Sequence, residues 1–194
     1  MDVIDLMSGT TDEELVERCR CGDVDAFNLL HSRYEQKLYR YAYLMSGSRE
    51  DACDIVQDTF IKAYKAISRF RGDSSIITWL MRICTNLCRT HARSKMFKAL
   101  KLSEIAVFRD FKIAEEQLDP RINVQQRLEA ESIRDLLLKL PAHQRELLVL
   151  YEYEELSTEE IARLQNTTPG SVRVRLFRAR QKLKEIALKT LVHM

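Results

Sequence analysis

The sequence predicts an all-α protein of two small helical domains joined by a flexible linker. Five glycines and three prolines in 194 residues are too few for a turn-rich β protein, and they favour long helices. Apolar residues recur with helical spacing in several segments, which fall into two groups along the chain. We therefore expect a first domain at residues 1–92, a linker at 93–127 and a second domain at 128–194.

The composition excludes several classes of protein. With 45% hydrophobic and 31% charged residues the chain is globular, not disordered. No apolar run of 18 residues occurs, which predicts no membrane insertion, and the acidic N-terminal stretch lacks the apolar core of a signal peptide. We expect a cytoplasmic protein. Its five cysteines are an odd number, which favours free and mostly packed thiols.

Helix signals follow one another through the first domain. Thr10 and Thr11 precede three acids, which predicts a capped helix start. The other expected helices run from about residue 25 to the break at 46–48, from 49 to about 68, and from about 75 to 91.

The helix expected at 49–68 has two faces. Its apolar residues lie within about 60° of one another at roughly 100° per residue, so they mark the buried side. The acids on the opposite side form either a solvated surface or a docking surface. The apolar set is Val56, Phe60, Ala63 and Ile67, and the acidic set is Glu50, Asp51, Asp54 and Asp58.

The pattern weakens after residue 92 and sharpens again near residue 133. The stretch 92–124 begins basic and then becomes irregular, so we interpret it as a linker with room for one loose helix. Apolar residues at 133–140 form a helical stripe that Pro141 stops, and another helix is expected at 144–153.

Residues 155–183 are typical of a helix-turn-helix that reads DNA. A short helix starts at Ser157, a break follows at 166–170, and a second helix runs from Ser171 to about Lys184. Its buried stripe is Val172, Leu176, Ala179 and Leu183. Seven basic residues between Arg163 and Lys184 have no acid among them, so we expect them to be uncompensated and to face a phosphate backbone.

Two separated segments resemble one protein family. The first comprises Glu50-Asp51, VQDTFIKAY at 56–64, FRGDS at 70–74, TWLMRI at 78–83 and Asn86; the second comprises Leu140-Pro141, Leu156-Ser157, Glu160-Ile161-Ala162 and GSVRVRLFRAR at 170–180. In order, spacing and linker length they resemble bacterial sigma factors of the extracytoplasmic-function group, sigma-E-like branch. The resemblance covers about residues 12–92 and 128–185.

The resemblance implies a transcription initiation factor with no catalysis and no cofactor of its own. Such a protein binds core RNA polymerase, at the β′ coiled coil and the β flap, and directs it to promoter DNA. The first domain corresponds to sigma region 2, which contacts the minus-ten element. The second corresponds to sigma region 4, which contacts the minus-thirty-five element. An anti-sigma factor usually holds such a protein inactive until a stress signal releases it.

The resemblance also assigns three sets of residues. The polymerase-binding set is Glu50, Asp51, Asp54, Gln57 and Asp58. The minus-ten set is Phe70, Arg71, Asp73, Ser74, Arg82 and Asn86. The minus-thirty-five set is Ser171, Arg173, Val174, Arg175, Phe177, Arg178 and Arg180.

The resemblance, taken together with side-chain chemistry, implies roles for individual residues. Phe70 would stack on a flipped base and Asn86 would read its edge, although packing of Phe70 within the loop is the alternative. Trp79 is expected to be structural. Arg173 and Arg178 suit base or mixed contacts, since arginine binds guanine bidentately. We expect phosphate contacts from Ser171, Arg175 and Arg180, and contact with a thymine methyl from Val174.

Rival interpretations are weaker. Cys84, Cys88 and His91 share a helical face without a fourth metal ligand, so we expect the two cysteines in the core. Cys19 and Cys21 carry no clear redox signal, and no nucleophile-base set occurs. The rival functions are a stand-alone helix-turn-helix transcriptional regulator, which would bind duplex DNA without polymerase, and a helical enzyme or adaptor.

Overall fold

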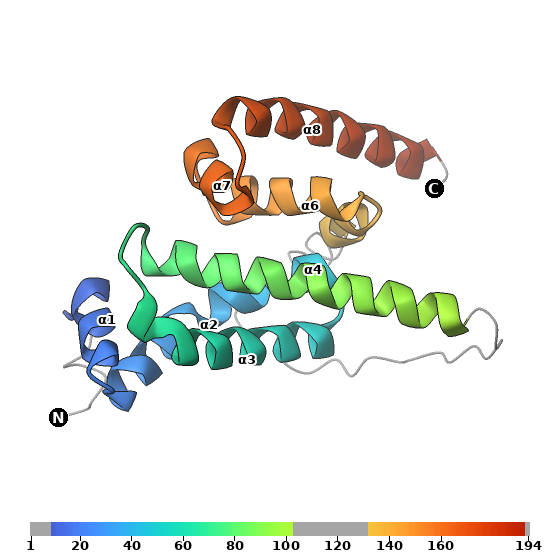
Figure 1. The fold of residues 1–194 in the computed structure, drawn as a ribbon. Helices are drawn as coiled ribbons and strands as arrows, with labels where there is room; N and C mark the ends of the chain where they lie inside the picture. Colours follow the sequence, from blue (N-terminus) through green and yellow to red (C-terminus); the bar gives the residue numbers. More distant parts are fainter. Residues whose placement is uncertain (1–8, 103–131, 193–194) are drawn as a thin grey trace.

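The computed structural model describes residues 9–102 and 132–192, and all of its regular elements there are helices arranged in two lobes (Figure 1). The all-α prediction is confirmed. The N-terminal lobe consists of α1 (Asp12–Arg20), α2 (Val24–Ser46), α3 (Arg49–Ala66), the 3-10 turn η2 (Ile67–Arg69) and α4 (Ile76–Leu102). The C-terminal lobe consists of a helical segment at 132–138, α6 (Ala142–Leu148), the π-helical segment η3 (Val149–Tyr153), α7 (Thr158–Gln165) and α8 (Pro169–Val192).

Side-chain caps fix where the helices begin. The Thr11 hydroxyl accepts a hydrogen bond from the Glu14 amide, and the Glu14 carboxylate accepts one from the Thr11 amide. Ser157 and Glu160 form the same reciprocal pair at the start of α7. Each cap stabilises its helix by about 1 kcal/mol. The predicted helix starts at residues 11 and 157 are confirmed.

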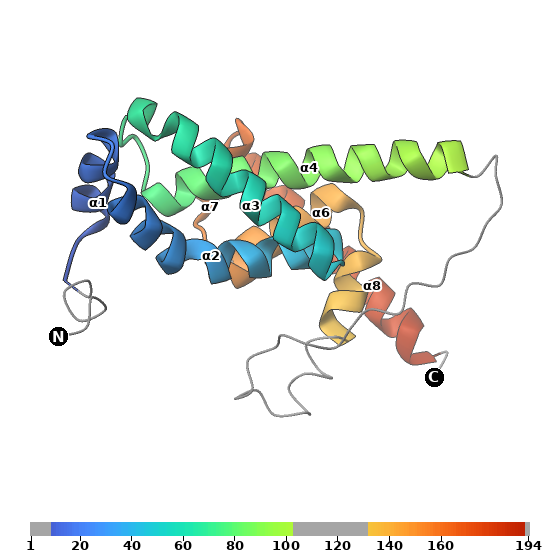
Figure 2. The ribbon, with the colours of Figure 1, turned by 90° about the horizontal axis from the view of Figure 1, so that it is seen from below.

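α4 is longer than the sequence analysis expected. It continues to Leu102, past the expected end at His91, and projects beyond the other helices of its lobe (Figure 2). Residues 92–102 contain neither glycine nor proline and include several lysines with good helix propensity, so nothing local ends the helix. The rest of the linker expected at 93–127 lies outside the described residues.

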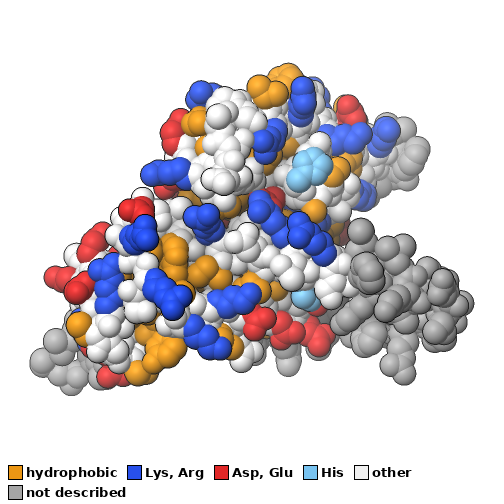
Figure 3. Space-filling view, in the orientation of Figure 1, with side chains coloured by type: hydrophobic (Ala, Val, Ile, Leu, Met, Phe, Trp, Pro, Cys, Tyr) orange, Lys and Arg blue, Asp and Glu red, His pale blue; other side chains and the backbone are white. Residues whose placement is uncertain are grey.

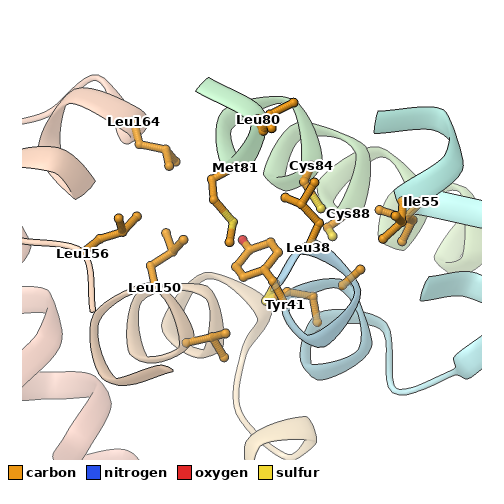
Figure 4. Packing of buried hydrophobic residues seen from close by; sticks show 14 of the residues in the cluster. Leu38, Tyr41, Ile55, Leu80, Met81, Cys84, Cys88, Leu150, Leu156 and Leu164 are labelled. Carbon is orange, nitrogen blue, oxygen red and sulfur yellow. The ribbon is translucent and has the colours of Figure 1, made fainter. Parts of the chain in front are cut away.

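The two lobes pack against each other through a shared apolar core. Tyr41 of α2 and Met81 of α4 lie close to Leu150 of η3 and Leu164 of α7 (Figure 4). The buried Tyr41 hydroxyl is 2.9 Å from the Thr85 hydroxyl, which satisfies both groups. We expected two domains joined by a flexible linker, and in the structure the two lobes are also in direct contact.

None of the helices in residues 9–102 and 132–192 is both long and apolar enough to span a membrane.

Candidate nucleic-acid and polymerase surfaces

α8 presents a mixed apolar and basic surface to solvent. Its expected stripe at 172, 176 and 179 is buried, as predicted, with residue 183 half-buried. On the outer side, Val174 and Phe177 are 52% and 62% exposed, and Arg178 is exposed beside them. Large apolar side chains at such exposure have no role in the core, and together with a basic side chain they suit contact with base edges and phosphates.

Arg175 turns inward and braces the helix-turn-helix. Its Nη2 donates to the Ser171 hydroxyl at 2.9 Å and to the Thr167 hydroxyl at 3.0 Å, and its Nη1 lies 3.4 Å from Gln165 Oε1. α7 ends at Asn166, whose backbone lies in the left-handed region with φ 57°. Asparagine tolerates this conformation better than most residues. Ser171 and Arg175 therefore satisfy each other in this conformation, and neither stands free as a phosphate anchor.

The expectation that the basic residues of α8 are uncompensated is wrong for three of them. Arg180 Nη2 lies 2.6 Å from Glu152, and its guanidinium lies 5.2 Å from the centre of the Tyr151 ring. Arg173 lies 3.9 Å from Glu159, and Lys182 lies 3.0 Å from Glu185. The acids come from outside the segment or from its end, where sequence adjacency did not reveal them. Exposed ion pairs of this kind contribute little to stability.

α3 presents the expected acidic face. Glu50, Asp54, Gln57 and Asp58 are exposed, while the expected stripe at 56, 60 and 63 is buried on the other side. Asp51 differs, because it is half-buried and lies 3.6 Å from the Nε2 atom of His91. The four exposed side chains form a continuous polar strip along the outer side of the lobe, as the helical spacing requires.

The loop before α4 does not present its aromatic ring. Phe70 is 8% exposed, its ring centre lies 5.1 Å from that of Trp79, and its carbonyl accepts a hydrogen bond from Arg20. The packing alternative describes Phe70 in this structure, so a ring exposed for base stacking is not present. Trp79 is half-buried against the core, in line with its expected structural role. Arg71 and Asp73 are exposed and Ser74 is half-buried.

One side of α4 carries a polar stripe that begins with the minus-ten candidates. Arg82, Asn86, Arg89 and Arg93 fall within about 60° of one another at roughly 100° per residue. Arg82 and Asn86 are exposed. Arg89 instead donates to both carboxylate oxygens of Glu146 in α6, at 2.9 and 2.6 Å, and Gln165 donates to the same carboxylate at 2.7 Å.

Sequence reasoning missed this contact between the lobes. Glu146 is 3% exposed and directly precedes the apolar run at residues 147–150. A lone acid next to an apolar segment is a signal that it has a partner, since burying an unpaired carboxylate is costly. That signal indicates a partner but not which residue supplies it.

Further contacts join the lobes around this pair. Arg134 donates to the Tyr43 hydroxyl and its guanidinium lies 5.4 Å from the centre of that ring. Lys37 of α2 lies 3.8 Å from Glu154, which is 2% exposed. Burial raises the pKa of Glu154, against the opposing effect of Lys37 and Arg40. The junction therefore holds two glutamates from the C-terminal lobe next to cations of the N-terminal lobe.

Three of the five cysteines, Cys19, Cys84 and Cys88, are buried as packing residues. Cys84 and Cys88 are buried in α4, as predicted, while Cys21 and Cys53 are exposed. A hydrogen bond with Cys84 and burial raise the pKa of Cys88, so its thiol stays protonated. In the part of the chain that the structure describes, no three potential ligands gather to hold a metal ion.

Both lobes match known protein families. Residues 30–97 match the family described as Sigma-70 region 2, and residues 130–183 match Sigma-70, region 4. The chain is 38% identical over 182 residues to the ECF RNA polymerase sigma-E factor of Haemophilus influenzae, a match covering 90% of this chain and 94% of the relative. It is 33% identical over 183 residues to the RNA polymerase sigma-H factor of Pseudomonas aeruginosa, covering 92% and 94%.

Solved structures show the same arrangement of elements. CnrH in complex with the cytosolic domain of CnrY has a TM-score of 0.66 and 27% identity, covering 91% of this chain and 96% of that chain. The sigma factor RpoE of Bartonella quintana in complex with the anti-sigma factor NepR has a TM-score of 0.64 and 25% identity, covering 83% and 96%.

Proposed function

We propose, since the chain belongs to the extracytoplasmic-function sigma factors of the sigma-70 family, that it binds core RNA polymerase and directs it to a set of promoters from the cytoplasm. The observation that carries the proposal is the presence of both sigma regions in one chain, each with an exposed polar surface of suitable charge. The N-terminal lobe is assigned to core polymerase and the minus-ten element, and the C-terminal lobe to the minus-thirty-five element. A stand-alone regulator is not favoured, because such a protein has no need of region 2.

The polymerase contact is assigned to the acidic strip of α3, formed by Glu50, Asp54, Gln57 and Asp58. Its side chains are exposed and lie opposite the buried stripe, so a partner can dock without disturbing the fold. A basic surface on the β′ coiled coil would complement it. Such charge complementarity speeds encounter and fixes orientation more than it raises affinity. Asp51 is assigned a supporting role, because it already faces His91.

The minus-thirty-five contact is assigned to the outer side of α8. Val174, Phe177 and Arg178 would enter the major groove, where Arg178 can bind guanine bidentately and the apolar pair can meet thymine methyls. Arg173 and Arg180 would exchange their weak acid partners for phosphates. Ser171 and Arg175 would hold the turn in shape so that these side chains reach the bases together.

The minus-ten contact is assigned to the loop at 71–74 and the stripe on α4. Arg71, Asp73 and Ser74 would surround the displaced strand, and Arg82 and Asn86 would contact it along the helix. Phe70 would hold the loop in place by packing against Trp79. Arg89 continues the same stripe, so the strand would compete with Glu146 for its guanidinium.

The arrangement in which the two lobes pack against each other, called the closed arrangement below, is the form that a regulatory partner would hold. CnrH and the Bartonella RpoE were solved with CnrY and with the anti-sigma factor NepR, respectively, and this chain shares their arrangement of helices. We assign the chain an anti-sigma partner of the same kind. Release of this partner would let the two lobes separate and contact the two promoter elements at once.

Competition for core polymerase tests this role. Purified chain should displace a labelled housekeeping sigma factor from core polymerase, and the variant Asp54→Lys should lose this ability. Glu13→Lys, an exposed acid on α1, is the matched control and should compete like the unmodified chain. A chain that never displaces the housekeeping factor is not a sigma factor in function.

A further inference from the structure

A cleft at the junction of the lobes has an excess of positive charge. It has a volume of about 490 Å³ and is lined by charged residues of three helices. They are Arg89 and Arg93 of α4, Arg145 and Glu146 of α6, and Arg175 of α8. Four arginines face one glutamate, which leaves a formal excess of three positive charges. Basic side chains gather along this boundary between the lobes (Figure 3).

The one carboxylate in the cleft is already used. Glu146 accepts two hydrogen bonds from Arg89 and one from Gln165. Its charge is balanced by Arg89 in bidentate geometry, the arrangement in which arginine and carboxylate pair most strongly. The other three arginines of the cleft must find their counter-charge elsewhere.

Arg145 is the least well satisfied of the three, because it is buried and its Nε atom has no partner. It is 9% accessible to solvent, and its Nε atom has no hydrogen-bond acceptor. Within residues 9–102 and 132–192 no carboxylate lies within ion-pair distance of its side chain. Burial lowers the pKa of Arg145, as expected where a cation has lost water and gained no anion. The buried Nε atom without an acceptor is costly, and an anion entering the cleft that Arg145 lines would offset that cost.

The remaining lining fits a ligand with both an anionic and an apolar part. Arg175 is bound by hydroxyl and amide oxygens alone, so its positive charge is not neutralised, and Arg93 is exposed at the edge. Met45 and Leu147, which are both buried, add apolar surface to the lining, and we call this surface the apolar floor of the cleft. A cleft of this volume is in the range of small-molecule sites.

We propose that this cleft binds a phosphorylated small molecule of nucleotide size. Arg93 and Arg145 can each offer phosphate oxygens a charged donor. Arg175 keeps its hydrogen bonds to Ser171, Thr167 and Gln165 and adds only the attraction of its charge, so that three positive charges suit a diphosphate better than a single phosphate. The apolar floor would hold the flat, less polar end of the molecule. Because the ligand would touch α4 of one lobe and α6 and α8 of the other, it binds the closed arrangement and shifts the population toward it.

Calorimetric titration of the isolated chain with GDP, ADP, pyrophosphate and guanosine tests this site. Both nucleotides should bind saturably at one site. Pyrophosphate should bind several-fold more weakly because it leaves the apolar floor uncovered, and guanosine should not bind. The variants Arg145→Gln and Arg93→Gln should each weaken GDP binding about tenfold or more, as expected for loss of a charged hydrogen bond. Arg93 is exposed, so its variant keeps the test valid if Arg145→Gln fails to fold.

The control is Lys65→Gln, an exposed cation on α3 away from the cleft, which should bind GDP like the unmodified chain. Absence of saturable binding by any phosphorylated probe overturns the proposal. An equal loss of GDP affinity in the Lys65 variant would also overturn it, because it would mean non-specific attraction. Equal affinities for pyrophosphate and GDP would overturn it too, because they would show that the site does not bind the nucleoside part. The titration contains no polymerase, so its failure leaves the proposed role in transcription untouched.

Discussion

Arg89 and Glu146 form a bidentate ion pair across the junction of the lobes, with Nε 2.9 Å from Oε2 and Nη2 2.6 Å from Oε1, although 57 residues separate them. The pair ties the stripe of α4 assigned to promoter DNA to a buried acid of the other lobe. While the lobes are in contact, the Arg89 guanidinium is bound to Glu146. Separation of the lobes would release it, so Glu146 and promoter DNA would compete for the same guanidinium.

The variant Arg89→Gln should loosen the closed arrangement by about 1–3 kcal/mol, because Glu146 would keep a buried charge without its charged partner. Small-angle X-ray scattering should show a larger radius of gyration. Arg69→Gln, an exposed cation on η2, should leave it unchanged. Identical scattering from all three proteins would mean that the pair does not hold the lobes together.

Glu154 should make stability depend on pH. Burial raises its pKa above the ordinary 4.5, so the folded chain binds a proton more tightly than the unfolded chain does. The free energy of unfolding should therefore fall as pH rises from about 4.5 through the raised pKa. The variant Glu154→Gln should have a higher Tm than the unmodified chain at pH 7 and an equal Tm near pH 4. Glu155→Gln, at an exposed neighbour, should show no such pH-dependent difference.

Reversing two charges on α3 should separate binding from folding. The double variant Asp54→Lys, Asp58→Lys should bind core polymerase at least tenfold more weakly in an equilibrium assay, because the exposed lysines would place like charges opposite the proposed basic surface of the β′ coiled coil. Its free energy of unfolding should change by no more than about 0.5 kcal/mol. Unchanged polymerase affinity would remove the assignment of this face.

Arg178 and Arg175, one turn apart on α8, should behave differently. Arg178→Ala should reduce transcription from promoters with a minus-thirty-five element and leave Tm unchanged, because its side chain is exposed. Arg175→Ala should lower the stability by about 1–3 kcal/mol, because it releases Ser171 and Thr167. Thermal unfolding and transcription on templates with and without the element measure both. The reverse pattern would exchange the two assignments.

Phe70→Ala should destabilise the N-terminal lobe by about 3–5 kcal/mol, as expected for removing a buried ring that packs against Trp79. Arg71→Ala, next to it and exposed, should leave stability unchanged and slow strand opening. Chemical unfolding and permanganate footprinting of the melted promoter measure the two effects. A stable Phe70→Ala protein that fails in strand opening would restore the ring to a role in base stacking.

Local signals predicted the helices well. The hydroxyl caps at Thr11 and Ser157 and the apolar stripe at Val172, Leu176 and Ala179 are properties of short segments, and the structure confirms them. The end of α4 was predicted too early, since a basic stretch without glycine or proline looked like a linker but kept its helical geometry.

Contacts between distant segments could not be predicted. The ion pairs of Arg180 with Glu152 and of Arg89 with Glu146, and the tilted ring contact of Phe70 with Trp79, depend on how the elements pack, which spacing along the chain does not encode. The same limit applies to the cleft around Arg145, whose lining comes from both lobes. Candidate surfaces on single helices, such as the acidic strip of α3, could be found from periodicity alone.

Run-off transcription with purified core polymerase and a promoter library measures whether the chain selects promoters. Adding the unmodified chain should yield discrete transcripts from a subset of promoters that share two upstream elements, and core polymerase alone should yield none of them. If the transcripts are the same with and without the chain, it does not direct polymerase to promoters.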